Sequence, residues 1–177
     1  MQNNEFLSGQ IRKKGIKKIS LGSGRQKPVG YLSADLAGVY QPDIVIDLNE
    51  NWQLPKDWFT NILAENIIEH IQDVPDFVNQ CHDILELNGE LKIIVPYWAG
   101  RWATRDPTHI HFFNLDSLNA WTCWHDRYIH LNQRRRFQQI SVVPMMEDGL
   151  TDKAELARLG FCPILCMEFN LKKIPWK

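Results

Sequence analysis

The sequence predicts a single α/β domain with an open sheet that is mostly parallel, has an antiparallel edge and carries helices on both faces. Short apolar segments alternate with a clear amphipathic helix between residues 16 and 96, a pattern that favours parallel strands joined by right-handed crossovers. Two later β-rich segments, 139–145 and 163–171, are expected to form the antiparallel edge. A chain of 177 residues with 44% hydrophobic content is long enough to bury one core. We therefore treat residues 1–177 as one domain.

The elements follow from local patterns. Residues 1–15 are polar and end in a basic run, so we expect a loosely held N-terminal extension. Asp73 precedes the amphipathic helix at 74–85 and is a candidate N-cap, and Asn88-Gly89 is expected to supply a left-handed stop. The parallel strands are predicted at 16–21, 30–34, 42–48, 60–64 and 91–96, and further helices at 115–124 and 151–159.

The junction between the first two strands is the strongest indication of a ligand. The first strand stops at Gly22-Ser23-Gly24, and the second stops at Asp35. Glycines allow the backbone to approach a nucleoside closely, and an acid at the end of the next strand can accept hydrogen bonds from ribose hydroxyls. NAD is disfavoured because the third glycine is displaced to Gly30 and the acid arrives too early. A phosphate-binding loop is also excluded, since no Gly-Lys-Ser/Thr follows the turn.

Further motifs appear downstream in a fixed order. Asp47 ends the third strand, Glu65-Asn66 follows the fourth, Glu69-His70 comes next, and the strand after Asn88-Gly89 ends in Val95-Pro96. Over residues 16–118 this order resembles the class I S-adenosylmethionine-dependent methyltransferases, in particular the methyltransferase type 11-like branch. The resemblance implies a Rossmann-like fold, S-adenosylmethionine as cofactor, and transfer of its methyl group to an acceptor.

The same resemblance assigns the cofactor-binding residues to the carboxyl ends of the strands, where an open parallel sheet binds its ligands. The glycine turn would contact the methionine and ribose, Asp35 the ribose hydroxyls, Asp47-Leu48 the adenine, and Glu65-Asn66 would border the transferable methyl. The assigned residues are Gly22, Ser23, Gly24, Asp35, Asp47, Leu48, Glu65 and Asn66.

Two features depart from the family pattern. Many members carry an acid two residues before the first glycine, where this chain has Ser20, and residues 24–30 are too few to hold the usual first helix. An alternative function is therefore a non-catalytic binding or interaction protein that retains the fold.

The segment 96–113 carries the candidate catalytic residues Asp106, His109 and His111. Methyl transfer from a sulfonium is an in-line displacement, so alignment is the main requirement. For a hydroxyl or amine acceptor, either histidine, tuned by Asp106, is a candidate general base. The alternative is that Asp106 forms a turn with Pro107 and the histidines only hold the loop.

A metal was also weighed, because residues two apart on a strand face the same way and His109 and His111 would then share a zinc ion. Hydrolases with such a pair are usually barrels of roughly 250 residues, and no third ligand is evident nearby in the sequence. We therefore predict no metal. Trp98 and Trp102 are expected to flank the pocket mouth and stack on a small-molecule or sugar-like acceptor. The run 134–136 is interpreted as a solvated turn.

The composition excludes some partners and favours a reducing compartment. A net charge of −1 argues against a general nucleic-acid or membrane surface, and residues 1–5 lack the pattern of a signal peptide. Four cysteines without a C-x-x-C pair are expected to be buried free thiols: Cys81, Cys123, Cys162 and Cys166. We expect a cytoplasmic protein that acts on a small molecule. Neither the acceptor atom nor the oligomeric state follows from the sequence.

Overall fold

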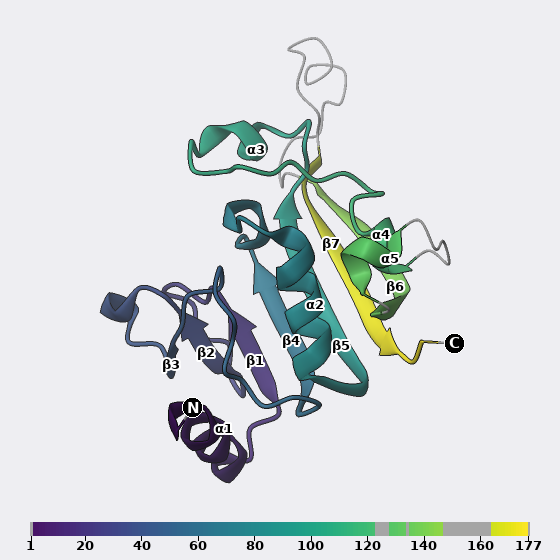
Figure 1. Cartoon of the computed structure of the whole chain (residues 1–177). Coiled ribbons are helices and arrows are strands. Elements are labelled where there is room, and N and C mark those ends of the chain that lie inside the picture. Colours follow the sequence, from purple (N-terminus) through teal and green to yellow (C-terminus); the bar gives the residue numbers. More distant parts are fainter. Residues whose placement is uncertain (1, 123–127, 134, 147–163, 177) are drawn as a thin grey trace.

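A computed structural model describes residues 2–122, 128–133, 135–146 and 164–176. Within these residues, strands form one seven-stranded sheet in the order β3-β2-β1-β4-β5-β7-β6 (Figure 1). The strands are β1 (Lys18–Leu21), β2 (Leu32–Asp35), β3 (Ile44–Val45), β4 (Phe59–Glu65), β5 (Leu85–Pro96), β6 (Arg136–Met146) and β7 (Ile164–Ile174).

The pairing confirms the predicted mixed sheet. Strands β1 to β5 pair in parallel with their neighbours, whereas β7 runs antiparallel to both β5 and β6. The third parallel strand, predicted at 42–48, is reduced to Ile44–Val45. The long hairpin of β6 and β7 closes the other side of the sheet.

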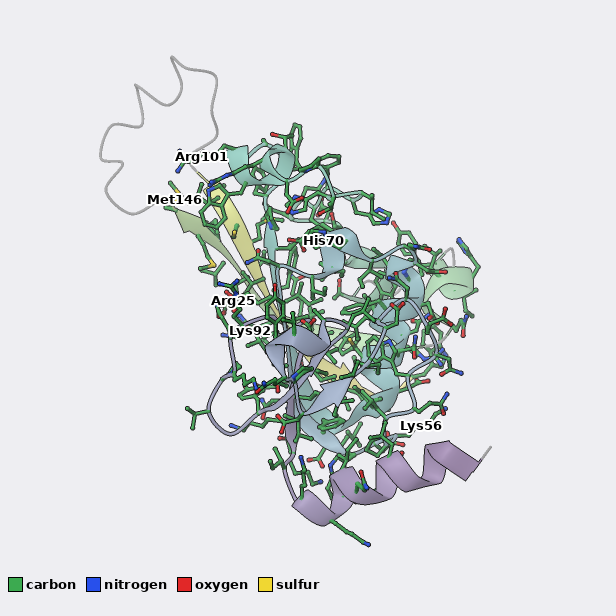
Figure 2. All side chains as sticks on the ribbon, turned by 90° about the vertical axis from the view of Figure 1, so that its left-hand side faces the viewer. Arg25, Lys56, His70, Lys92, Arg101 and Met146 are labelled. Carbon is green, nitrogen blue, oxygen red and sulfur yellow. The ribbon has the colours of Figure 1, made fainter. Side chains whose placement is uncertain are left out.

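Three described helices share one face of the sheet (Figure 1): α2 (Val74–Ile84), α4 (Asn119–Thr122) and α5 (Ile129–Asn132). The buried Asn79 of α2 ties them together, because its amide donates to the carbonyl of Leu131 at 2.7 Å and accepts from Nε1 of Trp121 at 2.8 Å. On the opposite side of the strands, Lys92 projects away from this layer (Figure 2). The helix predicted at 151–159 lies outside the described residues.

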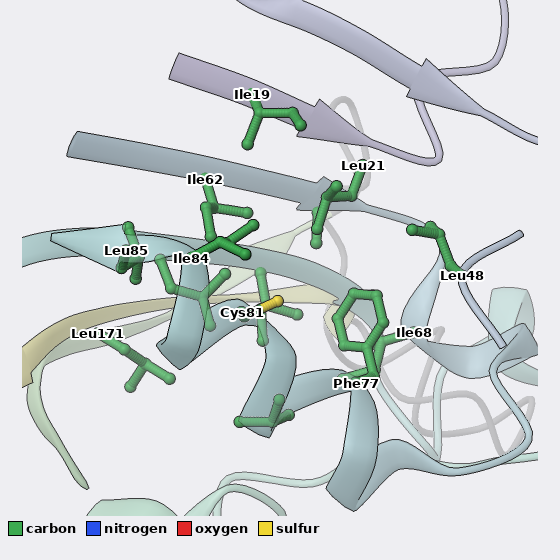
Figure 3. Packing of buried hydrophobic residues seen from close by; sticks show 14 of the residues in the cluster. Ile19, Leu21, Leu48, Ile62, Ile68, Phe77, Cys81, Ile84, Leu85 and Leu171 are labelled. Carbon is green, nitrogen blue, oxygen red and sulfur yellow. The ribbon is translucent and has the colours of Figure 1, made fainter. Parts of the chain in front are cut away.

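The core lies between the sheet and α2. Ile19 and Leu21 from β1 and Ile62 from β4 face Phe77 and Cys81 of the helix, all almost completely buried (Figure 3). Fully burying one such side chain contributes about 1.5–3 kcal/mol. Cys81 and Cys166 are buried free thiols, as predicted, and Cys123 and Cys162 lie outside the described residues.

The N-terminal prediction was wrong. Residues expected to be a loose extension form α1 (Gln2–Lys14). Ile11 is buried in the core cluster, Ser8 Oγ donates to the carbonyl of Gln53 at 3.2 Å, and the Arg12 guanidinium lies 4.7 Å from the centre of the Trp58 ring. A buried residue and a polar contact with the loop before β4 hold the helix in place.

Two further local predictions need correction. The Asp73 cap is confirmed, since its side chain accepts from the Asp76 amide at 2.9 Å, but α2 ends at Ile84 and the chain enters β5 at once. Asn88, with a φ of 67°, lies within β5 and is not the helix stop. The basic run at 134–136, predicted to be a solvated turn, is not one, because the Arg136 side chain that opens β6 is 1% exposed.

Two single-turn 3-10 helices, η1 (Gly38–Tyr40) and η2 (Ile68–His70), follow β2 and β4, and the short α3 (Arg101–Arg105) follows β5. All three follow the carboxyl ends of parallel strands, and η2 and α3 contribute residues to the lining of a cavity there. Among the described helices, none has the length and apolarity needed to cross a membrane.

Candidate cofactor and acceptor site

The strand order reverses between β1 and β4, and this switch point is where open α/β sheets bind ligands. Gly22 follows β1, Glu65 ends β4 and Asn66 follows it, so the sheet brings together segments about forty residues apart. They line a cavity of about 290 Å³, here called the glycine-loop cavity. Its lining consists of Ser20, Gly22, Ser23, Gly24, Arg25, Gln26, Pro28, Leu63, Glu65 and Asn66.

The glycine loop requires its glycines for different reasons. Gly22 has a φ of 63°, and a Cβ built on it would lie 2.7 Å from Cβ of Ile67. Gly24 has a φ of 52°, yet a Cβ there would meet nothing within 4 Å. Position 22 is therefore constrained by conformation and by packing, and position 24 by conformation alone. Between them, the Ser23 hydroxyl oxygen is buried in the cavity wall without a hydrogen-bond partner among the described residues.

Asp35 shapes this loop. Its Oδ2 accepts from the Gly24 amide at 2.7 Å and its Oδ1 accepts from the Ala37 amide at 2.7 Å. The carboxylate therefore fixes the turn after β1 from the end of the neighbouring strand β2. Each oxygen keeps a second acceptor position, although Asp35 does not appear in the lining of the glycine-loop cavity.

The two residues predicted beside the adenine differ in position. Asp47 is partly exposed and accepts from the Asn49 amide at 2.9 Å. The Leu48 side chain is 6% exposed and packs in the hydrophobic core, while its carbonyl accepts from Nε1 of Trp52 at 3.2 Å. Of the pair, Asp47 offers polar atoms to solvent.

A larger cavity of about 560 Å³ adjoins the first at the same edge of the sheet, and we call it the acceptor cavity. Asn66 belongs to the linings of both cavities. Its φ of 49° places a non-glycine residue in the left-handed region, and its amide donates to the carbonyl of Ile94 at 2.8 Å. Such conformations are maintained only where the surroundings impose them. The acceptor cavity is lined by Asn66, Glu69, His70, Pro96, Trp102, Arg105, Asp106, Pro107 and His109.

Glu69 is the most unusual residue of the acceptor cavity. Its side chain is 1% exposed, and neither carboxylate oxygen has a hydrogen-bond partner among the described residues. Burial raises the pKa of Glu69 to about 7. The backbone of Glu69 and the nearby His109 lower this pKa, but their effects are smaller than that of burial. The nearest cationic candidate is Nε2 of His109, 3.8 Å from Oε1.

Hydrogen bonds define the orientation of both histidines. Nδ1 of His109 lies 2.9 Å from the carbonyl of Ala103, which can only accept, so Nδ1 carries the proton. The Thr108 hydroxyl gives its single hydrogen to Asp106 at 2.6 Å and therefore accepts from Nδ1 of His70 at 3.1 Å. In each neutral ring, Nε2 is left with the lone pair.

The predicted catalytic residues are separated by the fold. Asp106 and His109 line the acceptor cavity, whereas His111 does not, and its backbone amide instead donates to the carbonyl of Glu69 at 3.3 Å. The segment is not a strand at this point, so the strand alternation on which the zinc alternative rested does not apply to the two histidines. Of the two tryptophans placed at the pocket mouth, Trp102 lines the cavity and Trp98 does not.

Sequence reasoning noted Glu69 but left it out of the site. One available signal was its position between isoleucines: η2 brings Ile68 and Ile71 into the core, so the acid between them is carried inward as well. A charged residue inside an apolar run is often paired or functional.

The sheet order, the glycine turn after β1 and the cavities at the switch point define a class I S-adenosylmethionine-dependent methyltransferase fold. Solved structures with this fold include an S-adenosylmethionine-dependent methyltransferase from Mesorhizobium loti, with 16% identity, a TM-score of 0.59 and coverage of 88% of this chain and 90% of that chain. Another, from Archaeoglobus fulgidus, has 13% identity, a TM-score of 0.62 and coverage of 96% and 94%.

A third structure is that of geranyl diphosphate C-methyltransferase from Streptomyces coelicolor A3(2), in complex with Mg²⁺, geranyl diphosphate and S-adenosyl-L-homocysteine. It shares 13% identity over 89% of this chain and 73% of that chain, with a TM-score of 0.61. No protein-family model and no curated protein matches the sequence. At these identities the comparisons establish the fold.

Proposed function

We propose that this protein is an S-adenosylmethionine-dependent methyltransferase that binds its cofactor in the glycine-loop cavity and a small acceptor in the acceptor cavity. The observation that carries the proposal is that the two cavities meet at Asn66, at the carboxyl ends of the parallel strands. Methyl transfer requires the sulfonium of one ligand to face the nucleophile of another in line. Two adjoining cavities with one shared residue suit that requirement.

Several groups of the glycine-loop cavity suit the cofactor. The loop permits close approach of the backbone, and the Ser23 hydroxyl is available to a ligand because no described residue bonds it. Glu65 places a carboxylate in the same lining, which favours a ligand carrying a positive sulfonium and a positive amino group. Where related enzymes carry an acid, Ser20 lines the cavity and is 4% exposed.

The carboxylates of Asp35 and Asp47 complete the proposed cofactor site. Asp35 has acceptor positions left for ribose hydroxyls, and Asp47 follows β3, the next strand in the sheet. We place the adenine beside Asp47 and the backbone of Leu48, since the Leu48 side chain belongs to the core.

In the acceptor cavity, His109 is the candidate group for accepting or directing a proton. Its Nε2 carries the lone pair, and its ring is fixed by the carbonyl of Ala103. Asp106 acts indirectly, because it accepts a hydrogen bond from the Thr108 hydroxyl, which in turn accepts one from Nδ1 of His70. The exposed face of Trp102 suits a planar or sugar-like acceptor.

Calorimetric titration of S-adenosyl-L-methionine and S-adenosyl-L-homocysteine into the wild type and Asp35→Ala tests the cofactor site. We expect saturable binding to the wild type and a loss on the order of 10–100-fold in the variant, because a charged acceptor that also shapes the loop contributes about 1.5–3 kcal/mol.

Glu50→Ala is the matched control, since Glu50 is an exposed acid in the loop after β3. We expect its affinity to stay within about twofold of the wild type. No binding of either compound to a folded wild type would contradict the proposal. Binding without methyl transfer to any hydroxyl, amine or carbon acceptor would favour a non-catalytic protein that retains the fold.

A further inference from the structure

Three potential metal ligands converge at the base of the acceptor cavity. Glu69, His70 and His109 each offer one ligand atom, and these atoms all lie within 4.8 Å of one another. The residues come from two segments, η2 and the loop after α3, which backbone bonds from Ile110 and His111 to the carbonyl of Glu69 hold together at 3.0 and 3.3 Å. Figure 2 marks His70 at this edge of the sheet. The juxtaposition therefore depends on the fold and not on local spacing.

The second feature is the unpartnered carboxylate. Both Glu69 oxygens are buried without a hydrogen bond from any described residue, although burying an ionised carboxylate is costly unless it is paired or coordinates a metal. The groups around Glu69 include His109 at 3.8 Å, Asp106 and the thiol of Cys166, and His70 and Arg105 line the same cavity. A cation at the centre of the cluster would give the carboxylate the partner it lacks.

The third feature is the way both rings are held. A histidine that binds a metal usually donates its other ring N–H to a carbonyl or carboxylate, which fixes the tautomer. His109 donates from Nδ1 to the carbonyl of Ala103. His70 donates from Nδ1 to Thr108, which Asp106 holds through a bond of 2.6 Å. Both rings thus have the outer contacts and the free Nε2 that ligation requires.

From these three features we propose that Glu69, His70 and His109 bind one divalent transition-metal ion of the zinc type at the base of the acceptor cavity. Two imidazoles and one carboxylate form a ligand set that binds zinc in catalytic sites, where the fourth position is left to water or substrate. Here the cavity of about 560 Å³ provides that open position.

The chemical role of the ion rests on the proposed function, whereas its binding does not. With the ion bound, Nε2 of His109 would ligate it and would no longer be free to accept a proton, so the ion would take over from the histidine base. An acceptor hydroxyl at the open position would be acidified by the metal and would release its proton to solvent water. The resulting oxygen attacks the methyl carbon of the cofactor. The new C–O bond forms as the C–S bond breaks, and the electron pair of that bond stays on sulfur, which gives S-adenosyl-L-homocysteine. The site therefore points to hydroxyl-bearing acceptors.

Titration of Co²⁺ into chelator-treated full-length protein, followed by visible absorption, tests the site. We expect one equivalent to bind with the intense bands of a tetrahedral or five-coordinate ion, and Zn²⁺ to displace it. Glu69→Gln and His109→Ala should each weaken binding by at least about 100-fold, and the positioning variant Thr108→Val by about tenfold.

His130→Ala is the matched control, because His130 is exposed on α5, away from the lining of the cavity, and should bind Co²⁺ like the wild type. Circular dichroism verifies folding of every variant, and His70→Ala replaces Glu69→Gln if the latter does not fold. The inference is overturned if folded wild type shows no saturable bands, or if the ligand variants bind as the wild type does.

A parallel titration with S-adenosyl-L-homocysteine separates the two proposals. Cofactor binding without Co²⁺ binding would overturn the metal site and leave the proposed function standing. Co²⁺ binding that depends on Glu69 and His109, without cofactor binding, would support the metal site and contradict the methyltransferase function.

Discussion

Two carboxylates near the opposite ends of helix α2, those of Asp83 and Glu69, lie in opposite electrostatic environments. At the amino edge of the sheet, Asp83 receives two bonds from Arg135, at 2.6 and 2.8 Å, and Lys56 lies 3.8 Å away. Burial opposes ionisation of Asp83, but Arg135 outweighs it and lowers the pKa well below its usual range. At the carboxyl edge, Glu69 has no such partner, and its pKa is raised to about 7.

This difference separates Asp83, whose carboxylate stabilises the fold, from Glu69, whose carboxylate is available to a ligand. Arg135 and Asp83 satisfy each other across 52 residues of sequence, and their bidentate geometry leaves little for an external group to contribute. Glu69 lies beside a cavity with its oxygens unbonded by any described residue. Variants at the two edges should therefore respond differently, and three predictions test this from the largest effect to the smallest.

The largest effect is expected at the glycine loop of the carboxyl edge. Gly22→Ala introduces a Cβ that would lie 2.7 Å from Cβ of Ile67, at a φ of 63°. The strain and the overlap together should lower the free energy of unfolding by about 3 kcal/mol. Denaturant unfolding measures it.

Gly24→Ala is the control, because it has a similar φ of 52° but open space around the new Cβ. Only the conformational cost of about 1–2 kcal/mol applies there. Equal losses in the two variants would contradict the packing role assigned to Gly22.

An intermediate effect is expected at the amino edge. Asp83→Asn removes the charge that pairs with Arg135, and we expect a loss of about 2 kcal/mol at pH 7. Because the folded pKa of Asp83 is lowered, its contribution is fully present above the unfolded pKa of about 3.9 and is lost as the pH falls through the folded pKa. The difference between wild type and variant should therefore shrink in acid.

Unfolding of both proteins across the acid range measures this difference. Asp116→Asn is the control, since Asp116 is exposed and accepts only a local bond from Asn119 at 3.1 Å; it should stay within about 0.5 kcal/mol of the wild type. A difference for Asp83→Asn that grows as the pH falls would contradict a lowered pKa of Asp83 in the folded protein.

The smallest effect, and one of opposite sign, is expected for Glu69→Gln in metal-free protein. The substitution removes a buried charge without breaking a hydrogen bond to any described residue. The free energy of unfolding at pH 8 should therefore rise by about 1 kcal/mol. Glu65→Gln, a partly exposed acid of the same edge, is the control and should change little. A loss as large as that of Asp83→Asn would show that Glu69 has a stabilising partner.

What the sequence predicted was mostly local. The parallel strands and the antiparallel edge follow from the apolar segments, and Asp35 was singled out as a candidate because it ends the second strand. The α1 helix was missed although Leu7 and Ile11 stand four residues apart and both pack on the core. That signal is short and lies in a polar context, and tertiary contacts with the loop before β4 decide the outcome.

The acceptor cavity shows why the rest was not predictable. Glu69 and His109 are forty residues apart, and their approach depends on how the loop after α3 returns to η2. From the sequence, a metal was considered only for His109 and His111, as alternate residues of a strand, and was not predicted. The loop is irregular there, and the backbone of His111 is used to hold Glu69.

Strand β5 has a consequence for exchange of amide hydrogens with solvent. Over residues 90–94 it pairs with β4 on one side and β7 on the other, whereas β3 contributes two residues at the far edge. Protection against deuterium uptake should therefore be greatest in β5 and fall toward β2 and β3. The loop that follows β1 lies on the side that opens more readily, so a ligand bound there would be seen first as slower uptake in β1 and β2.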